Sequence, residues 1–148
     1  MKSVLALFSL LLISSTATAA VVCTAEQKTM AESLLLPENQ TNEKLTLTLY
    51  KSAHQDAVAE IESEAKDLNI DRDTYVDSGA SFSRFISNLK KIDFTQLDDA
   101  EVVVMLFKIG ARLKIQSTIR FPGEDFESNI AAVLKIVEPL KKRIGLKF

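Results

Sequence analysis

The sequence contains little cysteine, tryptophan, glycine or proline, and these scarcities exclude several classes of protein. Among 148 residues there are one Cys, no Trp, four Gly and three Pro. A single Cys cannot form a disulfide within the chain, which excludes the small disulfide-stapled folds. So few Gly and Pro residues exclude collagen-like and low-complexity chains. With 47% hydrophobic and 26% charged residues, we expect one globular domain held together by its core.

An excess of charge of one sign is also missing. Eighteen Lys and Arg residues are set against twenty Asp and Glu residues, which gives a formal net charge of −2 at pH 7. A protein that binds nucleic acid neutralises many phosphates and usually has an excess of basic residues. We therefore expect no nucleic-acid partner.

No apolar run in the chain is long enough to span a membrane. A transmembrane helix needs about 20 consecutive apolar residues. The apolar run from Val4 to Ile13 is about half that length. The run from Val102 to Ile109 is interrupted by Lys108. The sequence therefore predicts no transmembrane segment in the mature chain.

Residues 1–20 have the layout of a secretory signal peptide. Lys2 supplies the positive start, Val4 to Ile13 the apolar stretch, and Ser14 to Ala20 a region of small residues. Within that region, Ala17-Thr18-Ala19 fits the A-x-A cleavage pattern. We expect residues 1–20 to be removed and residues 21–148 to form a secreted domain, which would be periplasmic if the source is a Gram-negative bacterium.

Two residues near the start of the mature chain are candidate sites of covalent modification. Cys23 has no partner in the chain, so it is either the site of an intermolecular disulfide that links a homodimer or a thiol without a role. Asn39 opens the only Asn-x-Ser/Thr sequon, Asn39-Gln40-Thr41. This motif predicts N-glycosylation in a eukaryotic secretory pathway and has no such meaning in a bacterium.

Helical periodicity dominates the chain beyond residue 23. Thr24 and Gln27 have the spacing of a capping box, which predicts a short helix that ends near Leu36, before Pro37. Four longer stretches follow, in which apolar residues recur every three or four positions. They are residues 45–68, 82–92, 98–113 and 124–143. Pro139 is expected to kink or shorten the last of them.

The stretch around Gly110 also fits a pair of strands. Val102 to Val104 are β-branched, apolar residues alternate with polar ones from Leu113 to Phe121, and Gly110 could turn a hairpin between them. The helical spacing from Val102 to Leu113 favours a helix. The predicted fold is therefore an all-α, single-domain bundle of four amphipathic helices plus a short N-terminal helix. An α+β fold with a hairpin around Gly110 is the alternative.

Residue types that commonly bind metals do not have the required spacing. His54 is the only histidine, its neighbour one helical turn further on is Val58, and no Cys lies near it in sequence. Residues 69–77 are acidic, but Thr74 and Ala80 occupy the positions that a calcium loop gives to Gly and Glu. We expect no metal and no cofactor, and we interpret residues 69–77 as a loop whose acids cap helices or face solvent.

Catalytic motifs are missing as well. Glu60, Glu62 and Glu64 are interpreted as a solvated helix face, because no acid, base or nucleophile converges on them in sequence. The chain has no G-x-S-x-G motif, no phosphate-binding loop and no Cys/His pattern. We therefore expect a protein without enzymatic activity.

Two noncatalytic functions fit these observations. The first is a secreted protein that acts through its surface on an extracellular protein partner, as effectors, signalling factors and inhibitors do. The alternative is an extracellular carrier of a small hydrophobic ligand, such as a lipid, in the bundle interior. Six bulky residues would line such a cavity: Phe82, Phe85, Met105, Phe126, Ile130 and Val133. Apolar residues at helical spacing usually fill a core, so recognition through the surface is the preferred hypothesis.

Overall fold

The computed structural model describes residues 23–117 and 126–145, and every regular element in them is helical. The elements are α2 (Ala25–Leu35), η1 (Pro37–Asn39), α3 (Glu43–Asp67), α4 (Arg72–Asp77), α5 (Ala80–Lys90), η2 (Phe94–Gln96), α6 (Asp99–Ser117) and α7 (Phe126–Ile144), where η marks a short 3-10 helix. The predicted all-α bundle is therefore confirmed. The predicted signal peptide, residues 1–20, lies outside the described residues, as does the end of the alternating stretch, residues 118–121.

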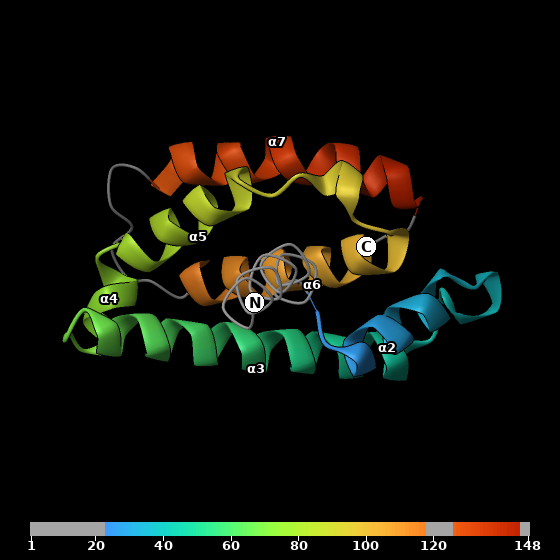
Figure 1. Ribbon diagram of the computed structural model, residues 1–148, viewed down its shortest axis with the longest axis horizontal. Helices are drawn as coiled ribbons and strands as arrows, with labels where there is room; N and C mark the ends of the chain where they lie inside the picture. The colour runs from blue at the N-terminus through green and yellow to red at the C-terminus, as the bar shows by residue number, and fades with distance from the viewer. Residues whose placement is uncertain (1–22, 118–125, 146–148) are drawn as a thin grey trace, which may run out of the picture.

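The central helix of the bundle is α6. In Figure 1 it runs between α3 along the bottom and α7 along the top, and it also packs against α2. Every residue from Ala100 to Phe107 is buried. The sequence predicted a single apolar face for this helix, and that prediction is wrong. Helix α6 is buried on most sides because other helices cover it from opposite directions. The alternative hairpin is wrong, since Gly110 lies inside α6.

Two clusters of buried side chains flank α6. One joins α5, α6 and α7 through large residues such as Phe82, Phe85 and Ile109. The other joins α2, α3 and α6 and is rich in small residues, among them Ala53 and Ala57 of α3. The distance between packed helices depends on the side chains at their contact. The alanines of α3 therefore allow its backbone to lie close to that of α6.

Local sequence signals define the ends of α2 and the buried face of α3. The Thr24 hydroxyl accepts a hydrogen bond from the Gln27 amide (3.1 Å), and the Gln27 side-chain oxygen accepts one from the Thr24 amide (3.0 Å). The predicted capping box is thus confirmed, and α2 ends at Leu35, two residues before Pro37. The predicted apolar stripe of α3 is buried along its length. It consists of Leu49, Ala53, Ala57, Ile61 and Ala65.

The acidic segment 69–77 is mostly a helix, which corrects the predicted loop. Helix α4 occupies Arg72–Asp77, and the Asp71 carboxylate caps it by accepting a hydrogen bond from the Thr74 amide (3.3 Å). Six residues are too few for hydrophobic periodicity to be recognised, so the pattern missed this helix. Gly79 has a φ of 80°, a left-handed conformation that glycine adopts easily, and it separates α4 from α5.

Helix α7 continues through Pro139 to Ile144, so the proline does not shorten it. Proline has no N–H to donate to the carbonyl four residues earlier, which here belongs to Lys135. Pro139 and Lys135 both lie on the side of α7 that faces the end of α5, where they line a groove.

Candidate functional site

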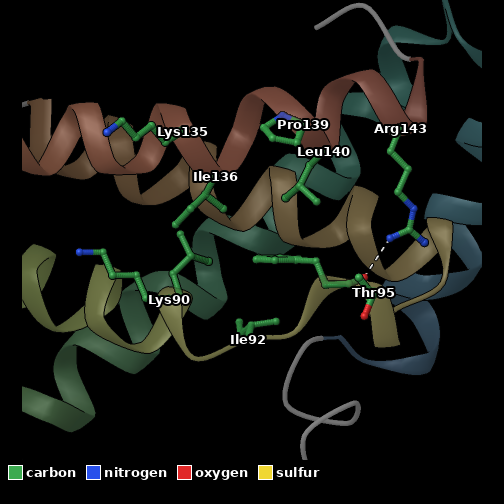
Figure 2. A pocket seen from close by; sticks show the side chains of 10 residues that line it. Lys90, Ile92, Thr95, Lys135, Ile136, Pro139, Leu140 and Arg143 are labelled. Carbon is green, nitrogen blue, oxygen red and sulfur yellow. Dashed lines mark hydrogen bonds between the residues drawn. The ribbon is translucent and has the colours of Figure 1, made fainter.

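An apolar depression lies between α7 and the segment that joins α5 to η2, and we call it the α5–α7 groove (Figure 2). Its volume is about 450 Å³. The lining residues are Leu89, Lys90, Ile92, Phe94, Thr95, Lys135, Ile136, Pro139, Leu140 and Arg143. Six of these ten side chains are apolar, so the groove exposes hydrocarbon to solvent.

The floor of the α5–α7 groove is continuous with the hydrophobic core. Leu89, in the last turn of α5, and Leu140, in α7, are buried members of the core cluster. Ile92, Phe94 and Ile136 pack against the same cluster and are only partly buried. The groove arises because α5 ends at Lys90 and the following residues do not cover this side of α7. Its apolar surface is therefore held in place by core packing on both walls.

One end of the groove is closed by Arg143. Its guanidinium donates to the Asp99 carboxylate (Nε to Oδ1, 3.0 Å), to the Phe94 carbonyl (2.9 Å) and to the Leu97 carbonyl (2.7 Å). These bonds join the C-terminal part of α7 to η2 and to the start of α6. The charge of Arg143 is thus paired within the protein, and its role at the groove is to hold η2 against α7.

The other end of the groove is open and cationic. Lys90 of α5 and Lys135 of α7 stand on opposite walls there, and both side chains extend away from Arg143 (Figure 2). Both residues are exposed, and neither forms an ion pair with any of the residues that the structure describes. The groove therefore combines an apolar floor with two unneutralised ammonium groups at one end.

A second, smaller groove lies over α6 between α3 and α7, and we call it the α6 groove. Its volume is about 220 Å³. Residues of α3, α6 and α7 line it: Tyr50, Leu106, Phe107, Ile109, Gly110, Leu113 and Lys141. It lies on a different side of α7 from the α5–α7 groove, because Lys141 and Ile136 are on different faces of that helix.

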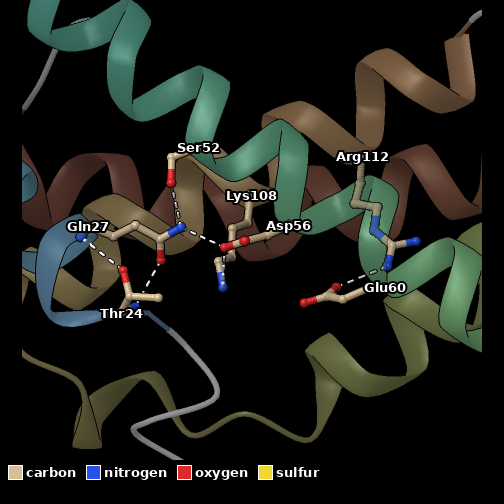
Figure 3. Close-up of polar contacts among 7 residues, drawn as sticks. All are labelled: Thr24, Gln27, Ser52, Asp56, Glu60, Lys108 and Arg112. Atoms are coloured by element: carbon tan, nitrogen blue, oxygen red, sulfur yellow. Dashed lines mark hydrogen bonds and ion pairs between the residues drawn. The ribbon is translucent and has the colours of Figure 1, made fainter.

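A chain of polar contacts ties α2, α3 and α6 together (Figure 3). The Gln27 amide nitrogen donates to the Ser52 hydroxyl (3.0 Å) and to the Asp56 carboxylate (2.6 Å). Asp56 also lies 3.8 Å from the ammonium of Lys108. Since these groups satisfy one another across three helices, we interpret them as structural.

The acids of α3 do more than form a solvated face. Glu60 and Glu62 are exposed, as expected, but Glu60 pairs with Arg112 of α6 (3.1 Å) and Glu62 pairs with Arg72 of α4 (3.0 Å). Glu64 accepts a hydrogen bond from the buried hydroxyl group of Tyr75 in α4. Each carboxylate thus has a partner on another helix, and the sequence pattern contains no signal for these partners because they are 10 to 52 residues away.

The six residues predicted to line a ligand cavity do come together, around α5, α6 and α7. Phe82, Phe85, Met105 and Val133 are buried within one core cluster. Phe126 and Ile130 are partly buried at its edge, and the Phe126 ring lies 6.3 Å from that of Phe82, measured between centroids. None of the six lines the α5–α7 groove or the α6 groove. Four of the six are therefore core residues, and a role of these residues in ligand binding stays a prediction.

Cys23 lies next to the capping residue of α2 and is partly buried against both core clusters. Burial, with a further contribution from the negative charge of Glu101, raises the pKa of its thiol. A raised pKa lowers the fraction of reactive thiolate at neutral pH. As the only cysteine, Cys23 forms no disulfide within the chain, and nothing in its surroundings supports the predicted Cys23-linked homodimer.

Asn39 and His54, the other two residues singled out by the sequence, are both partly buried. The side-chain amide of Asn39, in η1, donates to the carbonyl of Ser33, in α2 (2.9 Å), and the glycosylation of Asn39 stays a prediction. His54 lies on α3 with its ring 6.2 Å from that of Tyr50. Across the described part of the chain, no group of three or more His, Cys, Asp or Glu side chains is arranged to hold a metal ion. No helix there is both long and apolar enough to cross a bilayer.

Compared with known proteins, the chain matches no family model, no curated protein and no solved structure. Its function must therefore be inferred from its own surfaces. The α5–α7 groove is the candidate functional site, because it joins an open apolar floor to two lysines that have no ion-pair partner among the described residues.

Proposed function

We propose that this chain is a secreted, noncatalytic binding protein that recognises a protein partner through the α5–α7 groove. The observation that carries the proposal is the pairing of an open apolar floor with Lys90 and Lys135 at one end. The layout of residues 1–20 supports secretion. The absence of nucleophile, phosphate-binding and metal-binding motifs from the sequence supports a function without catalysis.

The shape of the groove favours a peptide over a small molecule. Sites for small molecules usually enclose about 70–90% of the ligand surface. The α5–α7 groove is open to solvent along one side, and its walls are helices and a turn. An amphipathic helix suits such a groove, because it lays a stripe of apolar side chains into the groove and leaves its polar face in water.

The positive charges of Lys90 and Lys135 favour a partner helix that carries acidic residues. An acidic residue near one end of the partner helix would lie between Lys90 and Lys135, while its apolar stripe would contact Ile92, Ile136 and Leu140. Complementary charges at the rim of an interface mainly raise the association rate and the specificity, while buried apolar contacts supply most of the affinity. The partner is therefore expected to present an acidic amphipathic helix.

A display library of amphipathic helical peptides tests this proposal. Half of the library carries Glu and Asp beside the apolar stripe, and the other half carries Lys and Arg at the same positions. Selection on the purified protein should enrich the acidic half, and the backbone amide signals that shift in NMR spectra should belong to residues that line the α5–α7 groove. Affinity should fall as salt is added, because rim charges are screened.

Two variants show whether the groove is responsible. The double variant Lys90→Glu with Lys135→Glu should lose binding to the acidic peptides and gain binding to the basic ones. Lys44→Glu with Lys51→Glu, a matched change of two exposed lysines on α3, should leave both affinities unchanged. Equal enrichment of the two halves of the library, or equal effects of the two double variants, would overturn the proposal.

A further inference from the structure

We infer that the α6 groove is a binding site for a small amphipathic carboxylate, such as a medium-chain fatty acid. The apolar part of the ligand would lie over Gly110, and its carboxylate would bind Tyr50 and Lys141. This site is separate from the α5–α7 groove, so it does not depend on the proposed protein partner.

The floor of the α6 groove is apolar and belongs to the central helix. Leu106, Ile109 and Leu113 form it, and they fall on one face of α6 because they are spaced three, four or seven residues apart. Tyr50 of α3 forms one wall and Lys141 of α7 the other. The volume of about 220 Å³ is below the range of about 300–1,000 Å³ that is usual for drug-sized ligands, which limits the occupant to a small molecule.

Gly110 gives the groove its depth. It lies in the interior of α6, where alanine would favour the helix and glycine disfavours it. A Cβ atom at this position would meet nothing within 4 Å, so no close packing with a neighbouring helix requires the glycine. Neither backbone geometry nor packing accounts for the residue. The missing side chain leaves open space at the point where α3 and α7 stand on either side of α6.

Two polar groups on the walls of the α6 groove have no partner among the described residues, and a carboxylate could bind both of them. The Tyr50 hydroxyl is buried and makes no hydrogen bond with the residues described. Buried polar atoms are rarely left unsatisfied in folded proteins. Lys141 is partly buried and has no ion pair among the described residues, and the Lys114 ammonium lies 5.6 Å from the centre of the Tyr50 ring.

A carboxylate fits this arrangement better than an alcohol or an amine. One carboxylate oxygen can accept a hydrogen bond from the Tyr50 hydroxyl while the group pairs with the Lys141 ammonium. A neutral alcohol would satisfy the hydroxyl but not the ammonium charge. An amine would place a third cation beside those of Lys141 and Lys114, which disfavours its binding.

Titration with three ligands that share one alkyl chain tests the inference. The probes are decanoate, decanol and decylammonium, each kept below the concentration at which it forms micelles. The chain has four glycines, so the amide signal of Gly110 can be followed in NMR spectra with little overlap. Decanoate should shift it saturably. Decanol should bind about tenfold more weakly or worse, since it lacks the charge-assisted bonds, and decylammonium should not bind.

Four variants locate the site. Gly110→Leu should abolish decanoate binding by filling the groove, and it should fold because leucine suits a helix interior and its Cβ has room. Tyr50→Phe and Lys141→Gln should each weaken binding about tenfold. Lys142→Gln removes a neighbouring exposed charge on α7 and should change nothing.

Three results would overturn the inference. They are the absence of a saturable shift with decanoate, unchanged decanoate affinity in the folded Gly110→Leu variant, and equal affinities for decanoate and decylammonium. The double variant Lys90→Glu with Lys135→Glu should bind decanoate as the unmodified protein does. A failure of peptide recognition at the α5–α7 groove is therefore distinguishable from a failure of ligand binding at the α6 groove.

Discussion

Arg112 and Glu60 form an ion pair in which one partner is buried and the other is hydrated. Nη2 of Arg112 lies 3.1 Å from Oε2 of Glu60, and the two side chains are 4% and 48% exposed. The guanidinium also donates to the Ser81 hydroxyl (3.1 Å) and lies over the Phe85 ring, 5.0 Å from its centre. Its Nε atom is buried and has no hydrogen-bond partner among the described residues. Among the residues that the structure describes, Glu60 is the one carboxylate that forms an ion pair with this buried guanidinium.

The two partners of this pair should differ sharply in their response to mutation. Glu60→Gln leaves a buried guanidinium without a counter-charge, and we expect it to lower the free energy of unfolding by about 2–3 kcal/mol, less than for a fully buried pair. Arg112→Met removes the buried charge and leaves Glu60 in water, so it should change stability by about 1 kcal/mol or less. Urea denaturation measures both. Glu62→Gln, in the exposed pair with Arg72, is the control and should cost at most about 1 kcal/mol. Equal losses for Glu60→Gln and Arg112→Met would contradict this account.

Gln27 should be the most sensitive polar residue of α2. It is buried, its oxygen caps the helix through the Thr24 amide, and its nitrogen donates to Ser52 and Asp56 of α3. Replacing it with alanine removes one half of the capping box and both bonds between helices. We expect Gln27→Ala to lower the free energy of unfolding by about 1–3 kcal/mol, measured by chemical denaturation. Gln55→Ala, at an exposed position of α3, should stay within about 0.5 kcal/mol of the unmodified protein.

Gly110 and Gly79 should respond to alanine in opposite directions. Gly110 lies within α6 and has open space where a Cβ would be, so Gly110→Ala should raise the free energy of unfolding by about 0.5–1 kcal/mol. Gly79 has a φ of 80°, which strains any residue with a Cβ, so Gly79→Ala should destabilise the protein by about 1 kcal/mol or more. Thermal or urea unfolding of the two variants makes the comparison. A loss of stability in Gly110→Ala would show that the floor of the α6 groove is already filled.

The parts of this fold that depend on neighbouring residues could be predicted from the sequence. The capping box of Thr24 and Gln27 is contained in four residues, and the buried stripe of α3 repeats over many turns of one helix. Helix α4 was missed because it has six residues, too few to show a period. The burial of α6 on most sides was also missed, because it depends on which other helices surround it, and periodicity within one helix does not contain that information.

The grooves could not be predicted for the same reason. Tyr50 and Gly110 line one groove although they are 60 residues apart in sequence. Lys90 and Lys135 stand on opposite walls at the end of the other groove and come from helices far apart in sequence. The sequence pattern suggested bulky apolar residues as the lining of a cavity, but Phe82, Phe85 and Met105 lie in the core. A groove forms where a side chain is missing, as at Gly110, or where a helix ends, as after Lys90. The pattern of apolar residues in the sequence does not mark such positions.

Tyr75 should make the stability of the protein depend on pH in the alkaline range. Burial, followed by the hydrogen bond that its hydroxyl donates to Glu64, raises the pKa of Tyr75 to about 12. An unfolded tyrosine titrates near pH 10. Because folding favours the protonated phenol, its contribution to stability is complete below about pH 10 and is lost as the pH rises from about 10 to about 12. In a Tyr50→Phe variant, Tyr75 is the only tyrosine, so its ionisation can be followed by ultraviolet absorbance. Tyr75→Phe should flatten the alkaline part of the pH–stability curve, and an equally steep curve in that variant would assign the loss to other groups.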